Sequence, residues 1–128
     1  MTLLLDTHAL LWFLWDDPRL GVSARTAIME PSNRKLVSVA SCWEIAIKAS
    51  LGKLQLGEPA YSFLAREIPG NNLELLPISL AHATAVEKLP FHHRDPFDRL
   101  LVAQALAERI PIISIDAALD PYGVTRLW

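Results

Sequence analysis

The chain is poor in cysteine, with Cys42 the only one among 128 residues. A single thiol excludes a disulfide within the chain and suits a reducing compartment. The four histidines show no H-x3-H spacing and no cysteine pair accompanies them, so no zinc-binding pattern is present. The sequence also lacks a basic signal-peptide start and any apolar run long enough to span a bilayer. We therefore expect a cytoplasmic protein that does not enter a membrane.

An excess of positive charge is also lacking. Lys and Arg number 12 against 14 Asp and Glu, which gives a formal net charge of -2. A general nucleic-acid binder carries a basic excess, so attraction to a polyphosphate here requires local basic patches or bound cations. Hydrophobic residues make up 52% of the chain, and no repeat or Gly/Ser-rich linker divides it. We expect one folded domain over residues 1–128.

Short aliphatic runs alternate with longer helical stretches along the whole chain. Strands are predicted at residues 3–5, 36–39, 73–76, 110–115 and 124–128. Helices are predicted at residues 7–15, 23–29, 41–51, 60–68, 80–89 and 96–109. This alternation favours a mainly parallel sheet with helices on both faces, which is a three-layer α/β/α domain. In such sheets, ligands bind beyond the carboxyl ends of the strands.

Four acidic residues fall where a parallel sheet would direct them toward one edge. Asp6 and Asp116 each follow a predicted strand, while Glu44 and Asp98 stand in the first turns of predicted helices. Grouped carboxylates repel one another unless a cation neutralises them, and Mg2+ or Mn2+ suits oxygen ligands of this kind. Such a site can activate a water and hydrolyse a phosphodiester without a protein nucleophile.

Each acid also has a purely structural explanation. Asp6 is suited to cap the helix that follows it, and Asp116 to form a turn after a strand. Glu44 ends an S-x-x-E stretch that fits a capping box, and it stands four residues before Lys48, a spacing that allows an ion pair. Asp98 occupies the third position of a helix, where the helix dipole favours an acid. The residues by themselves leave both interpretations open.

Four stretches together resemble a known family over nearly the whole chain: LLLDTH at 3–8, SCWEIAIK at 41–48, HRDPFDRLLVAQA at 93–105 and ISID at 113–116. In order and spacing they resemble PIN-domain proteins, in particular the VapC-type toxins of toxin–antitoxin pairs. The third stretch is the most specific of the four. The resemblance implies a three-layer α/β/α fold and Mg2+- or Mn2+-dependent cleavage of structured RNA, namely tRNA or ribosomal RNA.

The resemblance also assigns roles to individual residues. It implies that Asp6, Glu44 and Asp98 are the essential metal-site acids, with Asp116 in a more variable fourth place. Thr7 and Ser114 occupy positions where the family often has a hydroxyl that steadies an acid or a metal-bound water, and all four acids are retained. A VapB-like antitoxin is the implied partner, and a homodimer is the implied state of the toxin.

Other residues have both a functional and a structural interpretation. Trp12 and Trp15 crowd one short helix, so we expect part of that helix to contact the antitoxin rather than the core. Basic residues near the acids could contact RNA phosphates, although a solvated loop, or a pairing of Arg99 with Asp95, explains some of them equally well. These candidates are Lys48, His92, His93, Arg94 and Arg99.

Two other classes of protein remain as alternatives. One is another metal-dependent phosphohydrolase with an acidic pocket, but the first strand is followed by Asp6-Thr7-His8 rather than the D-x-D of a dehalogenase-type phosphatase. A phospho-receiver domain would need an acceptor Asp at the end of another strand, where Ala40 and Ser41 stand. The other class is a non-catalytic PIN-like module that binds RNA or protein. Metal-dependent cleavage separates these alternatives.

Overall fold

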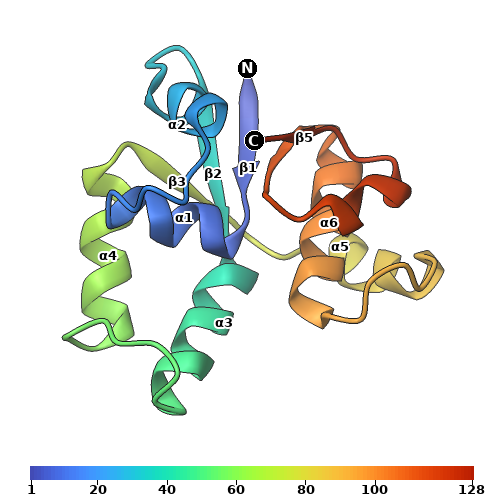
Figure 1. Ribbon diagram of the computed structural model, residues 1–128. Coiled ribbons are helices and arrows are strands. Elements are labelled where there is room, and N and C mark those ends of the chain that lie inside the picture. The colour runs from blue at the N-terminus through green and yellow to red at the C-terminus, as the bar shows by residue number, and fades with distance from the viewer.

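Five parallel strands form the centre of the computed structural model, which describes residues 1–128 (Figure 1). The strand order is β3-β2-β1-β4-β5, so β1 lies in the middle and β3 is an edge strand. β1 pairs in register with β2 from Thr2 opposite Arg34 to Leu5 opposite Val37. The strand bounds are Thr2–Leu5, Arg34–Ser38, Leu73–Leu76, Ile112–Ile113 and Arg126–Leu127 for β1 to β5.

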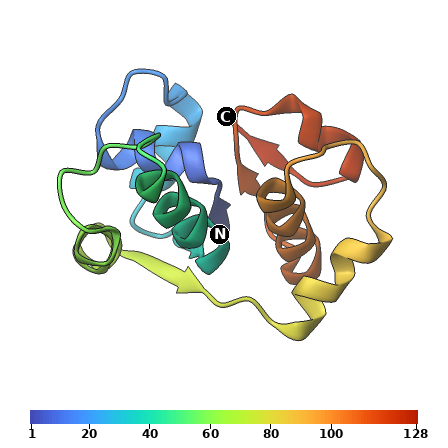
Figure 2. The same ribbon diagram turned by 90° about the horizontal axis from the view of Figure 1, so that it is seen from below.

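Helices cover both faces of this sheet, which confirms the predicted three-layer α/β/α fold (Figures 1 and 2). On one side lie α1 (Thr7–Leu14), α2 (Val22–Met29), α3 (Val39–Ser50) and α4 (Ala60–Gly70). On the other side lie α5 (Leu80–Ala85), α6 (Pro96–Glu108) and the short 3-10 helices η1 (Val86–Lys88) and η2 (Ala117–Tyr122). None of the helices has the length and apolar character needed to cross a membrane.

The central strand β1 is buried on both faces. Leu3 and Leu5 belong to the larger hydrophobic cluster, together with residues of α1 and α2. Leu4 points the other way and joins the cluster formed with α6 and η2. All three leucines have no exposed surface. This explains why the strand reads as a continuous apolar run, because alternate residues face different layers of helices.

Several predicted boundaries differ from those of the structure. Helix α3 begins at Val39 rather than at Ser41, because Ser38 is the N-cap and its hydroxyl accepts the backbone N–H of Ala40 at 3.0 Å. The predicted capping box with Glu44 is therefore not formed. The predicted helix at 80–89 divides into α5 and η1, and η1 ends at Lys88 because Leu89, the residue before Pro90, is held extended. Strand β4 is also shorter than predicted.

Candidate active site

The site lies where the connections of the sheet diverge. From β1 the chain proceeds to β2 and β3 on one side, and then crosses to β4 and β5 on the other. The gap between β1 and β4 at their carboxyl ends is therefore the switch point of the sheet, where parallel α/β proteins bind ligands. Asp6 directly follows β1, and Asp116 comes three residues after the end of β4. Both acids thus reach this crevice.

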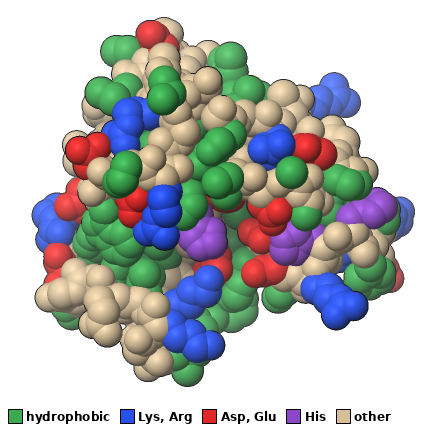
Figure 3. Space-filling view, viewed as in Figure 1, with side chains coloured by type: hydrophobic (Ala, Val, Ile, Leu, Met, Phe, Trp, Pro, Cys, Tyr) green, Lys and Arg blue, Asp and Glu red, His purple; other side chains and the backbone are tan.

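A small cavity of about 100 Å3 at this point brings all four predicted acids together. A fifth, Asp95, also lines it, and the sequence had suggested no site role for that residue. Lys48 is the single Lys or Arg in the lining. In Figure 3 acidic side chains gather beside histidines near the middle of the face. The lining residues are Asp6, Thr7, His8, Glu44, Lys48, Asp95, Asp98, Ile115 and Asp116.

Asp6 combines its two predicted roles. Its Oδ1 accepts the backbone N–H of Ala9 at 2.8 Å, which caps α1. The side chain is also one wall of the acid pocket, and the residue is 5% exposed. Burial raises the pKa of Asp6, while the Ser114 hydroxyl and the Ala9 N–H act in the opposite direction. Capping and a place in the site are therefore not alternatives for this residue.

Glu44 is held by groups on both of its carboxylate oxygens. Thr7 Oγ1 lies 2.6 Å from Oε1, and Lys48 Nζ lies 2.6 Å from Oε2. The Thr7 hydroxyl is also 3.0 Å from Ser41 Oγ. The ion pair between Glu44 and Lys48 is therefore formed, as the spacing of the two residues had suggested. Because both carboxylate oxygens already have partners, Glu44 contributes its negative charge to the pocket rather than a free oxygen ligand.

Asp98 is placed by the start of α6. Asp95 Oδ1 accepts the backbone N–H groups of Phe97 at 2.8 Å and of Asp98 at 3.2 Å, and Pro96 occupies the first helical turn. Burial raises the pKa of Asp98 to about 7, and the charges of Asp95 and Asp6 add to this effect. His93 acts in the opposite direction. A bound cation would remove the cost of ionising this carboxyl group.

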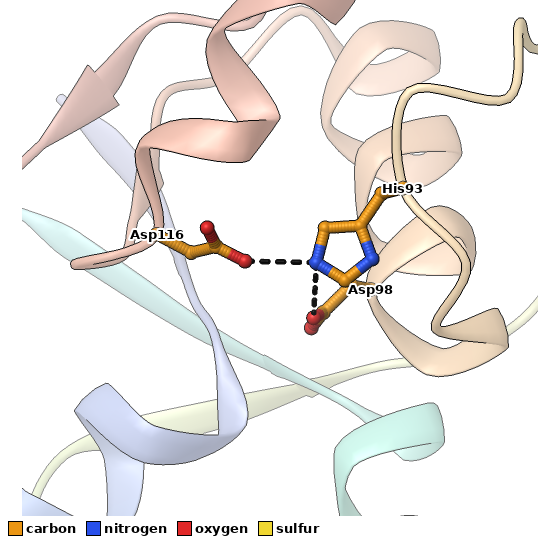
Figure 4. Close-up of side chains that lie close together, drawn as sticks. All are labelled: His93, Asp98 and Asp116. Carbon is orange, nitrogen blue, oxygen red and sulfur yellow. Dashed lines mark hydrogen bonds and ion pairs between the residues drawn. The ribbon is translucent and has the colours of Figure 1, made fainter.

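His93 joins two of the acids across the pocket (Figure 4). Its Nε2 lies 2.8 Å from Asp116 Oδ2 and 3.3 Å from Asp98 Oδ2. The other oxygen of Asp116 accepts the N–H of Ala118 at 3.0 Å, so this acid caps η2. Ser114 Oγ accepts the backbone N–H of Asp116 at 3.0 Å. His93 was expected as an RNA contact, and its closeness to two acids was not visible in the sequence.

The other basic candidates divide by exposure. His92 and Arg94 are exposed, and the ring of His92 packs edge-on against Tyr122 with 5.0 Å between centroids. Arg99 is 5% exposed and does not pair with Asp95. Its guanidinium donates to backbone oxygens of the 86–90 segment and to the Tyr122 hydroxyl. Arg99 therefore anchors the loop before α6, and its burial contradicts the expected RNA contact.

The two tryptophans of the first helix differ in their surroundings. The His8 ring stacks on Trp12 at 5.4 Å, the Arg19 guanidinium lies 4.8 Å from the same indole, and Trp128 meets it edge-on at 5.7 Å. Most of the contacts of the Trp12 indole are thus made within the protein. Trp15 stands at the end of α1 and is 42% exposed. Both line a second hollow of about 360 Å3, which shares Thr7, His8 and Lys48 with the acid pocket.

These features define a class of protein, namely a parallel α/β domain with a carboxylate pocket at the switch point of its sheet. The family model of the PIN domain matches residues 3–123. Ribonuclease VapC22 of Mycobacterium tuberculosis strain H37Rv is 31% identical over 125 residues, covering 98% of this chain and 95% of the relative. The chain therefore belongs to the PIN-domain family, among its VapC-type members.

Solved structures share the same fold at low sequence identity. VapBC2 from Rickettsia felis, solved with a DNA fragment from its promoter, is similar with a TM-score of 0.73 and 16% identity, covering 99% of this chain and 98% of that one. VapBC-1 from nontypeable Haemophilus influenzae gives a TM-score of 0.67 at 16% identity, covering 99% and 97%. At this identity the likeness shows the fold alone, and it agrees with the predicted α/β/α architecture.

Proposed function

We propose that this protein is a cytoplasmic Mg2+- or Mn2+-dependent endoribonuclease, the toxin of a VapBC-type toxin–antitoxin pair. The observation that carries the proposal is the acid pocket, where five carboxyl groups share about 100 Å3 with one lysine. Carboxylates at this density are unfavourable in a folded protein unless a cation compensates them. The membership of the chain in the PIN-domain family supports the same activity.

The chemistry of the donor set fits a hard divalent cation. The pocket offers carboxylate oxygens and no cysteine, and burial has raised the pKa of Asp98 to about 7. Asp6 and Asp98 would hold the ion, because neither makes a contact to a basic side chain as short as that of Glu44 with Lys48 (2.6 Å) or of Asp116 with His93 (2.8 Å). Glu44 and Asp116 would add negative charge around it. When bound, the ion supplies Lewis-acid polarisation of a phosphodiester and lowers the pKa of a bound water.

Basic residues around the acid pocket support an RNA substrate. Lys48 lines both the acid pocket and the larger hollow beside it, and Lys53 and Arg19 line that hollow as well. Exposed His92 and Arg94 lie in the loop before α6. The lysines and arginines among these groups supply local positive charge that the net charge of -2 does not. We propose structured RNA, tRNA or ribosomal RNA, as the substrate.

The direct test is cleavage of RNA by the purified protein freed of antitoxin. Total tRNA and ribosomal RNA are incubated with Mg2+ or Mn2+, and products are resolved on denaturing gels. We expect cleavage that a chelator abolishes and that added Mg2+ restores. Asp6→Asn should cleave no faster than the chelated wild type, with an unchanged circular dichroism spectrum. Cleavage that persists both in the chelator and in the Asp6→Asn variant would contradict the proposal.

We also propose a VapB-like antitoxin and a homodimer, following the VapBC pairs that share this fold. Trp15 is the sharpest probe of the antitoxin surface, because it is 42% exposed at the end of α1. Trp15→Ala should weaken antitoxin binding about 10-fold or more, as loss of an exposed aromatic anchor does. Leu80→Ala, an exposed apolar residue on the opposite layer, is the matched control and should bind normally.

Calorimetric titration of each variant with the cognate antitoxin measures the effect, and thermal unfolding checks the fold. Equal affinity of the Trp15→Ala variant and wild type would rule out this part of α1 as the antitoxin surface. Sedimentation equilibrium of the free toxin tests the homodimer.

A further inference from the structure

The cluster of His93, Asp98 and Asp116 has the composition of a metal site. One ligand atom from each lies within 4.8 Å of the other two, and all three residues are half-buried. The imidazole Nε2 faces both carboxylates, with its shorter contact to Asp116 (Figure 4). Neutral imidazole nitrogen is a common ligand of transition metals, so this triad could hold an ion through one nitrogen and two oxygens. The hydrogen bond made by the other ring nitrogen, Nδ1, excludes that arrangement.

His93 Nδ1 accepts a hydrogen bond from the backbone N–H of Asp95, with 3.0 Å between the two nitrogens. A backbone amide always carries its hydrogen, so Nδ1 must be the unprotonated nitrogen. A neutral imidazole has one N–H, which therefore stands on Nε2 and points at the two acids. Coordination of an ion by Nε2 would leave neither nitrogen protonated, which requires an imidazolate. While the Asp95 contact is kept, Nε2 is a donor and not a ligand.

The ring is also fixed from its backbone. The N–H of His93 donates to the Tyr122 hydroxyl at 2.9 Å, and that hydroxyl accepts from the Arg99 guanidinium at 3.2 Å. Arg99 further holds the carbonyl of Pro90 at 2.8 Å. The His93 side chain is 17% exposed. The loop that carries the histidine is thus attached to α6 and η2, so the direction of its Nε2–H is set by the fold.

We propose that His93 is a positioning residue, whose Nε2–H orients Asp116 and Asp98 and which binds neither metal nor RNA. The proposal rests on the proposed metal-dependent function of the same pocket. Asp116 has its two oxygens engaged by His93 and by the Ala118 N–H. Asp98 makes only the longer contact of 3.3 Å, which leaves its carboxylate the freer of the two. His93 therefore supports the pocket through these two acids.

Three variants of His93 separate a donor from a ligand. Gln places its amide nitrogen near the position of Nε2 and keeps a donor there, whereas Asn reaches only to Nδ1 and Ala keeps neither. We expect His93→Gln to bind Mg2+ within about 3-fold of wild type, and His93→Asn and His93→Ala to bind about 10-fold more weakly. Titration calorimetry with Mg2+ alone is the measurement. In RNA cleavage the losses should fall on kcat, with KM nearly unchanged.

Nitrogen-15 NMR of the imidazole is the readout that does not depend on activity. We expect the proton of His93 on Nε2 both in the metal-free protein and at saturating Mg2+. Loss of that proton when Mg2+ binds, or a His93→Gln variant as weak as His93→Ala, would overturn the assignment. A rise in KM alone would indicate an RNA contact instead. If wild type binds no Mg2+ or Mn2+, the proposed function fails, whereas the metal-free spectrum still tests the orientation of His93.

Discussion

Asp98→Asn is expected to slow RNA cleavage by at least about 10^3-fold, which corresponds to about 4 kcal/mol of transition-state stabilisation. The carboxylate is the least engaged of the acids in the pocket, so its charge is the one most available to a cation. Asparagine keeps the shape of the side chain and removes that charge. Single-turnover cleavage with saturating Mg2+ measures the effect. Glu87→Gln, a neutralised acid on the exposed η1, is the control and should cleave like wild type.

The same variant should be more stable than wild type when no metal is present. Since burial raises the pKa of Asp98 to about 7, the folded protein retains a proton that the unfolded chain, with a pKa near 3.8, releases. The folded state then binds more protons, so its stability falls as pH rises from about 4 to about 7. Asparagine carries no such dependence. The stability difference should therefore grow over that range, toward an upper limit of about 4 kcal/mol above pH 7, which the partial solvent exposure of the side chain reduces.

Urea unfolding in a chelator at several pH values measures this difference in the free energy of unfolding between the variant and wild type. Addition of Mg2+ should reverse the order, because only wild type gains from ion binding. An Asp98→Asn variant that is less stable than wild type at every pH would show that ionising the Asp98 carboxyl group does not destabilise the metal-free protein. Retention of cleavage within 10-fold of wild type would remove Asp98 from the proposed metal site.

Arg99→Met is expected to destabilise the protein by about 3 kcal/mol, the second large effect. Methionine keeps the apolar stem, but the carbonyls of Val86, Leu89 and Pro90 lose their donor. Arg94→Met is the matched control, because that side chain is exposed, and it should change stability by less than about 0.5 kcal/mol. Urea unfolding of both variants is the measurement. Equal stability of the two would contradict the role of Arg99 as an anchor.

The sequence predicted most of what is set by neighbouring residues. The buried strand before Asp6 is visible because three leucines occupy both faces, and the start of α6 is visible because Asp95 and Pro96 are a local helix signal. A local signal can also mislead. The S-x-x-E stretch ending at Glu44 fits a capping box, yet Ser38 caps that helix instead. The strand simply ends earlier than its apolar pattern suggests.

What the sequence could not predict depends on contacts between distant segments. The sequence separation between His93 and Asp116 is 23 residues, and no periodicity relates them. The burial of Arg99 likewise follows from how the loop at 86–90 folds over α6. The second role of Asp95, as a wall of the pocket, requires the three-dimensional position of its helix. Such facts become available only with the structure.

The four predicted acids have unequal surroundings, which suggests unequal roles. Glu44 contacts Lys48 at 2.6 Å and Asp116 contacts His93 at 2.8 Å, whereas Asp98 makes only a longer contact of 3.3 Å to a basic side chain and Asp6 is bonded by the Ala9 N–H and the Ser114 hydroxyl. We propose that Asp6 and Asp98 bind the ion and that the other two supply charge. Neutral variants of Glu44 and Asp116 should therefore lose less cleavage activity than neutral variants of Asp6 and Asp98.

The central claim is that this pocket binds a divalent cation through its carboxylates. Anomalous X-ray diffraction from crystals soaked in Mn2+ tests it most directly, because manganese gives a signal that carbon, nitrogen and oxygen do not. We expect an anomalous peak in the pocket, with oxygen atoms of Asp6 and Asp98 as protein ligands and no nitrogen ligand from His93. The absence of a peak at saturating Mn2+, or a peak with no oxygen atom of Asp6 or Asp98 as a ligand, would contradict the claim.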